Sequence, residues 1–197
     1  MSLPDPPFIV KLEDFITMIR NFLALLALVG LGLFATDQAS AAAASVQKVT
    51  ESVSIDAPPA KVWGIIQNFG DMSWHPAVKS DTATNGNTVG SVRTLDLGGP
   101  KLIESLTKYD ATKLRYSYRI TDDPNNVKTL PVTKYSSSLS VKKGAKGSTT
   151  VTWTGRFLRA DPSPTPAAGQ DDESAVKAVT GVYRGGLDNL KKLAETK

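Results

Sequence analysis

The sequence lacks cysteine and has a single histidine, His75. Without cysteine the chain can form no disulfide, and it offers neither a thiolate ligand for zinc nor a cysteine nucleophile. One histidine also excludes a metal site built from several imidazoles. We therefore expect no metal ion and no other cofactor, and any chemistry must rest on carboxylates, aromatic side chains and His75.

Clusters of basic residues are also scarce. The formal net charge is +4, and residues 1–41 hold two of the 23 basic residues and four of the 19 acidic ones, which leaves the remainder at +6. No run of lysine and arginine is interleaved with aromatic residues, the pattern typical of a nucleic-acid-binding face. A mild basic excess spread along a chain is typical of a solvated surface, so we expect no nucleic acid as a partner.

No apolar run is long enough to span a membrane comfortably, because a spanning helix needs about 20 apolar residues. The run over 22–34 has about thirteen, follows the positive Arg20 and precedes a small-residue series that includes Ala39-Ser40-Ala41. These features predict a signal peptide over 18–41. The protein is thus expected to be periplasmic or secreted, with no membrane attachment after signal cleavage. The alternative is an uncleaved anchor, which is less favoured because no stop-transfer charge cluster follows.

The segment before Met18 fits a signal peptide poorly. Residues 1–17 contain three prolines and three acidic residues, whereas a signal n-region is short and positively charged. We interpret 1–17 as a mis-annotated upstream extension, with translation starting at Met18. The folded domain is expected over 46–197.

Strict alternation of polar and apolar residues dominates the chain after residue 46. Val49, Val53 and Ile55 share one face of a first strand, and its polar partners share the other. A short helix over 60–69 and a helical turn over 72–77 follow, with Pro59 suited to the first helical turn. Recurring turn signals then divide six further strands, which are expected over 78–85, 91–97, 101–109, 113–121, 133–142 and 148–158.

The last segment predicts a long helix. Asp171 to Ser174 supply a negatively charged start, and apolar residues recur at three- and four-residue steps to about Glu195. The order of elements predicts an α+β fold, in which a curved seven-stranded antiparallel sheet wraps around this helix and can enclose a cavity. Gly181, Gly185 and Gly186 lie inside the helix. One interpretation is that they allow the helix to approach the sheet or a bound ligand closely. The other is that glycine is simply tolerated near a helix end.

Several segments resemble the SRPBCC superfamily, which includes START, Bet v 1-like and polyketide cyclase proteins. The resemblance covers essentially all of 46–194 and implies the helix-grip fold, whose element order is the one expected above. It rests on five segments: 57–63 (APPAKVW), 74–78 (WHPAV), 90–93 (GSVR), 130–132 (LPV) with Tyr135, and 183–190 (YRGGLDNL). The WHPAV segment behind an export signal is most similar to bacterial MxaD-like proteins, periplasmic accessories of methanol oxidation.

Within this superfamily the plant abscisic-acid receptors suggest which positions face a ligand. Glu104 and Tyr135 match two of their ligand-facing positions, residues 98–100 match their gate loop, and Leu130-Pro131 lie near their latch-like loop. The receptors' pocket lysine has no clear counterpart here. The resemblance therefore implies a ligand cavity without the group that binds a carboxylate.

The polar candidates each have a functional and a structural interpretation. Glu104 alternates with Leu102 and Leu106, so its carboxylate is expected to point inward, where a buried charge needs a partner. Arg93 is the nearest such partner, and the pair either orients a ligand or braces the sheet interior. His75 is either a satisfied structural histidine or a binding or catalytic group. Aromatic residues on inward faces either line the cavity or belong to the core. The predicted ligand-binding set is Trp74, His75, Arg93, Glu104, Tyr116, Tyr118, Tyr135, Trp153 and Tyr183.

Three functions compete at this point. The leading hypothesis is an exported, non-catalytic protein that binds a small hydrophobic molecule or assists a periplasmic dehydrogenase. The alternative is a cyclase or dehydratase acting on a polyketide-like substrate, with His75, Glu104 and Tyr135 as acid and base candidates. A third is an interaction module whose cavity is closed by side chains. No motif for a catalytic triad, a phosphate-binding loop or a metal site occurs.

Overall fold

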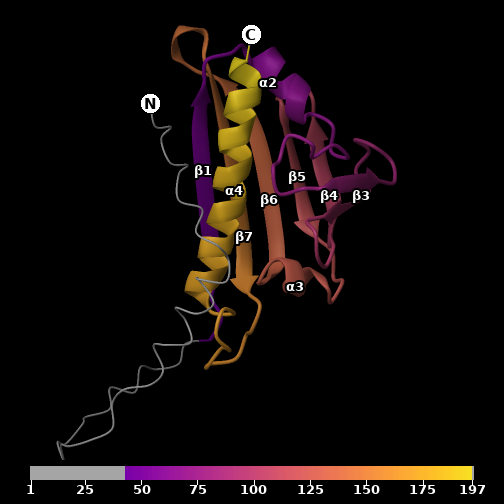
Figure 1. Cartoon of the computed structure of the whole chain (residues 1–197), viewed down its shortest axis with the longest axis vertical. Helices are drawn as coiled ribbons and strands as arrows, with labels where there is room; N and C mark the ends of the chain where they lie inside the picture. Colours follow the sequence, from indigo (N-terminus) through magenta and orange to yellow (C-terminus); the bar gives the residue numbers. More distant parts are fainter. Residues whose placement is uncertain (1–42, 197) are drawn as a thin grey trace, which may run out of the picture. The chain divides into compact units, whose positions relative to one another are not determined.

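The described part of the chain, residues 43–196, begins just before the first predicted strand (Figure 1). The structure is a computed structural model. The predicted upstream extension and signal peptide lie outside the described residues. Within 43–196, no helix combines the length and apolar character that crossing a membrane requires, and no three Asp, Glu or His side chains gather in a way that could hold a metal ion.

Seven strands form one antiparallel sheet in the order β1-β7-β6-β5-β4-β3-β2. The predicted number of strands and their pairing in successive hairpins are confirmed, because β2 to β6 each pair with the next strand along the chain. The first strand, β1, pairs antiparallel with the last strand, β7, and Val53 lies opposite Val151. The strand bounds are β1 Gln47–Ile55, β2 Ser80–Ala83, β3 Val92–Asp96, β4 Leu102–Asp110, β5 Arg115–Ile120, β6 Val132–Lys143 and β7 Thr149–Arg159.

Helix α4, Asp172–Glu195, lies against the concave side of this sheet (Figure 1). The Asp171 carboxylate accepts a hydrogen bond from the Ser174 N–H at 2.7 Å and caps the helix, as its charged start predicts. Burial of each large apolar side chain contributes about 1.5–3 kcal/mol. One face of α4 is buried along its whole length: Ala175, Val179, Tyr183, Leu187, Leu190 and Ala194. This is the helix-grip arrangement that the sequence predicts.

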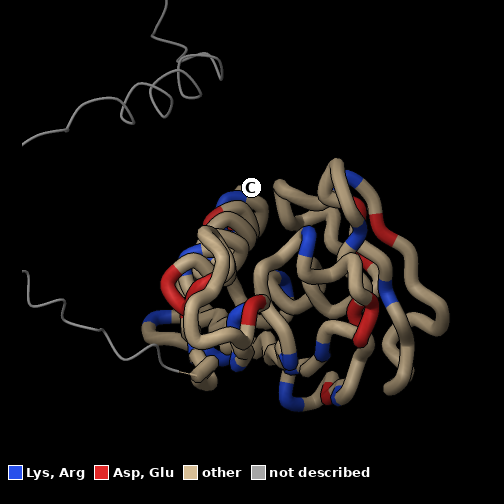
Figure 2. The backbone as a smooth tube through the Cα atoms, turned by 90° about the horizontal axis from the view of Figure 1, so that it is seen from below, with Lys and Arg blue, Asp and Glu red and all other residues tan. Residues whose placement is uncertain are grey.

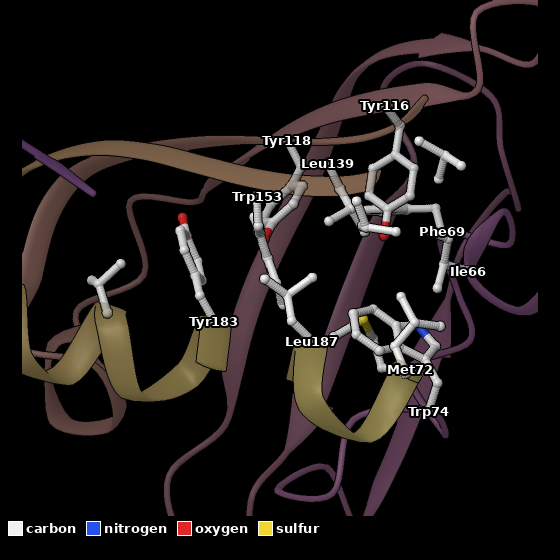
Figure 3. Close-up of a cluster of buried hydrophobic side chains, with 14 of the residues drawn as sticks. Ile66, Phe69, Met72, Trp74, Tyr116, Tyr118, Leu139, Trp153, Tyr183 and Leu187 are labelled. Carbon is white, nitrogen blue, oxygen red and sulfur yellow. The ribbon is translucent and has the colours of Figure 1, made fainter. Parts of the chain in front are cut away.

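The core fills the space between α4 and the sheet. Figure 3 shows Tyr183 and Leu187 of α4 pointing toward the strands that carry Tyr118, Leu139 and Trp153. All five side chains are at most 2% exposed. The contact is aromatic as well as aliphatic, because the Trp153 and Tyr183 rings stack with centroids 4.4 Å apart and planes 10° from parallel.

The remaining helices are short. Helix α2, Pro59–Ile66, begins at the predicted proline and ends three residues before the expected position. Residues 72–77 form two successive turns, in which the backbone N–H groups of His75 and Val78 donate to Met72 and His75 carbonyls. Pro76 limits them to turns because it disfavours helical backbone in the preceding residue. The sequence did not predict α3, Asn126–Thr129, which follows β5.

Candidate ligand-binding cavity

A cavity of about 60 Å³ lies between the sheet and α4. Its apolar wall is built by side chains from the segment after α2, from β3 and β4, from the loop after α3 and from α4: Met72, Val78, Leu95, Leu97, Leu102, Leu130 and Val182. Seven residues with polar atoms complete the lining: His75, Arg93, Glu104, Tyr118, Thr129, Tyr135 and Trp153. Apolar walls with a few convergent polar groups are typical of small-molecule sites.

The charged element of the lining is one buried ion pair. Arg93 on β3 and Glu104 on β4 occupy paired register positions, and Arg93 Nε donates to Glu104 Oε2 at 2.7 Å. Arg93 Nη1 also donates to the Phe69 carbonyl at 2.9 Å. The guanidinium lies over the rings of Phe69 and Tyr118, 4.3 and 4.7 Å from their centroids. The predicted pairing of Arg93 with Glu104 is thus present, and both residues line the cavity.

Burial opposes the charge on each member of this pair, and the charge of the partner favours it. Burial raises the pKa of the Glu104 carboxyl above its ordinary value, and the adjacent Arg93 opposes that shift. Burial by itself lowers the pKa of the Arg93 guanidinium, but Glu104 and the neighbouring tyrosines more than offset this effect, so that the net shift is upward. Arg93 therefore stays charged, and its field favours the ionised carboxylate at 2.7 Å. The cavity consequently contains a charged but mutually neutralised pair.

A hydroxyl network lies beside the ion pair. Tyr135 and Tyr183 join through their hydroxyls at 2.7 Å, and the Tyr183 hydroxyl lies 3.0 Å from Ser137 Oγ. The indole Nε1 of Trp153 donates to the Tyr118 hydroxyl at 3.0 Å and to Ser137 Oγ at 2.9 Å. Burial raises the pKa of Tyr118 and of Tyr135 well above the ordinary tyrosine value. These phenols therefore remain protonated and act as hydrogen-bonding groups rather than as bases.

Both ring nitrogens of His75 are engaged by backbone groups. Nε2 lies 2.9 Å from the Val182 carbonyl of α4, and Nδ1 accepts from the Ala77 N–H at 3.2 Å. This pairing assigns the proton to Nε2 in a neutral ring. Burial lowers the pKa of His75 below its ordinary value, the Val182 carbonyl opposes the shift, and Arg93 adds to it. The imidazole thus anchors the segment before β2 to the helix.

The neutral state of His75 predicts a pH dependence of stability. Because the folded-state pKa is lowered, the unfolded chain takes up the proton more readily once the pH falls below about 6.5. The free energy of unfolding should fall by about 1 kcal/mol between pH 7.5 and 5.5 through this group. Urea unfolding at both pH values should show this loss in the wild type and a smaller loss in His75→Gln. Equal losses in the two proteins would refute the assignment.

Gly186 allows the helix to approach this site. A Cβ at position 186 would lie 2.5 Å from His75 Cδ2 and 2.9 Å from Trp153 Cζ3, which is too close for any side chain. Apart from the adjacent residues and the backbone of the helix itself, no atom of the described residues lies within 4 Å of a Cβ built at Gly181 or Gly185. Close approach therefore explains Gly186, and tolerance explains the other two glycines.

The structure brings six of the nine predicted residues to the cavity: His75, Arg93, Glu104, Tyr118, Tyr135 and Trp153. The other three lie behind the lining. Tyr183 stacks on Trp153, Tyr116 packs on Phe69 with centroids 6.1 Å apart, and Trp74 packs on Trp153 at 5.6 Å. The Trp74 indole nitrogen is buried without a hydrogen-bond partner among the described residues. These three side chains are core residues in this arrangement.

Other lining residues escaped the sequence analysis. Leu95 and Leu97 alternate with Arg93 on β3 and beyond, and Leu102 alternates with Glu104, so the same period-2 pattern could have found them. Thr129 carries no such signal, because it ends a four-residue helix that no pattern predicts. Leu130 follows that helix, and only the resemblance to the latch-like loop pointed to it.

Two segments meet at one rim of the cavity. The first connects β3 with β4 and includes Pro100, and the second comprises Thr129 and Leu130. The Thr129 hydroxyl donates to the Pro100 carbonyl at 2.7 Å and joins the two segments. We call them the rim segments, residues 97–102 and 129–130. They include residues 98–100 and Leu130, where the resemblance to the plant receptors leads us to expect a gate and a latch-like loop.

A family model described as polyketide cyclase / dehydrase and lipid transport matches residues 46–195. The chain belongs to this family. The match covers all seven strands and α4, and the expected membership of the SRPBCC superfamily is confirmed. No curated protein matches the chain.

Solved structures agree with this family assignment. The protein XoxI from Bacillus cereus is 30% identical with a TM-score of 0.61, and the match covers 75% of this chain and 94% of XoxI. A protein from Nitrosospira multiformis is 28% identical with a TM-score of 0.61, over 76% of this chain and 97% of that one. Norcoclaurine synthase from Thalictrum flavum is 15% identical with a TM-score of 0.56, over 79% and 98%, and this last likeness shows the fold alone.

Proposed function

We propose that this family member binds a small, largely apolar ligand in the cavity between the sheet and α4. The observation that carries the proposal is the convergence of Arg93, Glu104, Tyr118 and Tyr135 on one apolar-walled space. Apolar contact gives affinity in proportion to the buried area, about 25 cal/mol per Å², and the few polar groups fix the orientation of the ligand.

The present cavity is small for this role. Pockets that bury drug-sized ligands measure about 300–1,000 Å³, whereas this cavity of about 60 Å³ has room for only a few heavy atoms. We propose that the described structure is the closed form and that a ligand enters when the rim segments separate. The exposed Thr129 hydroxyl joins the two segments, through a hydrogen bond to the Pro100 carbonyl at 2.7 Å and a longer one to the Lys101 carbonyl at 3.4 Å. An exposed hydrogen bond contributes about 1 kcal/mol, so this link between the segments is weak.

Binding is better supported than catalysis. The cyclase alternative needs His75, Glu104 and Tyr135 as acid and base groups. In the closed form His75 is bonded at both nitrogens, Glu104 is held by Arg93, and the Tyr135 hydroxyl bonds to Tyr183. A group engaged in this way must break a protein contact before it can exchange a proton with a substrate. We therefore propose that these groups orient a ligand.

The setting we propose is outside the cytoplasm. The sequence over 18–41 supports export, and the resemblance of residues 74–78 to MxaD-like proteins supports a role as an accessory to a periplasmic oxidoreductase. Delivering or retaining a small molecule for such an enzyme is compatible with an apolar-walled binding cavity.

Cross-linking the rim segments tests the entry route. Because the chain has no cysteine, a Pro100→Cys/Thr129→Cys variant carries two unique thiols that a short bismaleimide can join. The fluorescent probe 1-anilinonaphthalene-8-sulfonate should bind the untreated variant, and cross-linking should weaken its binding at least tenfold. The single variant Thr129→Cys treated with the same reagent is the control. Unchanged affinity after verified cross-linking would contradict the proposed route.

A further inference from the structure

The side of the sheet opposite α4 carries an unusually uniform set of side chains. Register places the outward residues of five strands in four rows. The rows that begin at Lys48, Thr50, Ser52 and Ser54 of β1 continue through β7 and β6, and the first three reach β4. With one exception, Asp110, every residue in these rows is a serine, threonine, lysine or arginine.

Six basic residues stand among these hydroxyl side chains, and all six are exposed. We call them the outer basic face: Lys48, Lys108, Arg115, Arg119, Lys142 and Arg156. They are scattered over more than a hundred positions of sequence, and only the sheet gathers them. Figure 2, viewed along the long axis of the molecule, shows Lys and Arg segments along the side of the sheet away from α4.

The positive charge of this face is largely uncompensated. Arg115 lies 3.7 Å from Asp110, the one acidic residue in the rows. The other five basic residues of the outer basic face form no ion pair with any residue of 43–196. Like charges gathered on one surface repel each other and do not stabilise the fold. A surface that concentrates one sign of charge attracts a partner of the opposite sign and raises its association rate.

The face also has the shape of a contact surface. Four rows of alternate residues span about 20 Å along the strands, and five strands span about 20 Å across them. A groove lined by Lys108, Lys113, Arg115 and Lys142, with serines of β5 and β6 between them, crosses one part of the face. Guanidinium and ammonium groups donate charge-assisted hydrogen bonds to carboxylates, and the serine and threonine hydroxyls between them can also donate.

We propose that the outer basic face is a docking surface for an acidic patch on another protein. Charge complementarity is the argument for this partner. A membrane is less favoured because interfacial binding needs large apolar anchors, and of the exposed large apolar side chains in 43–196 only Val46 and Val89 border the face. A nucleic acid is less favoured because the rows contain no aromatic side chain for stacking, and of the two tyrosines that line the groove Tyr116 is buried and Tyr109 is only partly exposed.

We expect this docking to be transient and to weaken with increasing salt concentration. Stable interfaces bury aromatic residues at their centre and are depleted of lysine and serine, whereas this face is rich in both. Exposed charges lose their attraction over about 10 Å at 0.1 M salt. The face lies on the opposite side of the sheet from the cavity, so this proposal does not depend on the proposed ligand.

Charge reversal with a matched control tests the proposal, and the probe is poly-L-glutamate. The face variant is Arg119→Glu/Lys142→Glu/Arg156→Glu. The control, Lys101→Glu/Lys177→Glu/Lys192→Glu, changes the net charge equally at exposed residues off the rows. Affinity in 50 mM NaCl should fall at least tenfold in the face variant and less than threefold in the control. Raising the salt to 300 mM should abolish the wild-type binding.

Thermal melts verify that both variants are folded, and glutamine versions of the same triple substitutions replace any variant that is not. Equal losses in the face variant and the control would overturn the proposal, because net charge alone would then explain binding. Tighter, face-dependent binding to phosphatidylglycerol vesicles or to a DNA duplex than to poly-L-glutamate would also overturn it, by assigning the face to a membrane or a nucleic acid.

Discussion

Replacing Arg93 with methionine is expected to lower the free energy of unfolding by about 3–5 kcal/mol. The substitution leaves the Glu104 carboxyl, which is 3% exposed, without the guanidinium that bonds it at 2.7 Å. It also removes the donor to the Phe69 carbonyl and the cation over two aromatic rings. Guanidinium chloride unfolding of the two proteins at pH 7.5 measures this loss.

A double variant separates the charge from the packing. Arg93→Met/Glu104→Leu removes both charges and keeps apolar volume, and replacement of a buried pair in this way is often close to neutral. We expect the double variant to be more stable than Arg93→Met by at least about 1.5 kcal/mol, the order of a coupling between residues in contact. If the two substitutions were simply additive, the pair would not be the buried, mutually dependent unit described above.

Gly155→Ala is expected to cost about 2–4 kcal/mol, a large value for one added methyl group. Gly155 lies on β7 and faces α4, and a Cβ there would collide with the Tyr183 hydroxyl. That hydroxyl bonds to both Tyr135 and Ser137. To make room, Tyr183 must move and leave buried polar groups unpaired, which costs about 1–3 kcal/mol for each group.

The variant Tyr183→Phe is the matched control for this clash. It removes the colliding oxygen, and the next nearest atom of residue 183 then lies 3.3 Å from the added Cβ. The cost of Gly155→Ala should therefore be smaller in the Tyr183→Phe background than in the wild type, by at least about 1 kcal/mol. The same cost in both backgrounds, measured by chemical denaturation, would show that the hydroxyl is not the obstacle.

Local patterns predict the sheet and the long helix because the physics that forms them is local. Period-2 alternation together with turn signals identifies the strands, and Asp171 with the apolar stripe of α4 identifies the helix. The pair Arg93 and Glu104 could be predicted for the same reason. Both point inward by alternation, and a hairpin makes β3 and β4 neighbours, so the register brings the two side chains together.

Contacts between distant elements could not be predicted in this way. One example is the hydrogen bond between His75 and the Val182 carbonyl, and another is the close contact between Gly155 and the Tyr183 hydroxyl. Both depend on how α4 packs against the sheet, which no local sequence pattern encodes. Helix α3 was not predicted because the hydrogen bonds that hold it in place come from residues outside the helix. The buried Asn126 side chain accepts from the Ile103 N–H and donates to the Thr121 carbonyl, each at 2.8 Å.

The indole signals of the three tryptophans test the central claim, that the cavity binds a ligand. Trp153 lines the cavity, Trp74 packs behind it, and Trp63 lies on α2 against Tyr109. In ¹H–¹⁵N spectra recorded during titration with 1-anilinonaphthalene-8-sulfonate, the Trp153 indole signal should shift most and the Trp63 signal should stay in place. A saturating titration that leaves Trp153 unmoved, or that shifts Trp63 alone, would contradict a binding site between the sheet and α4.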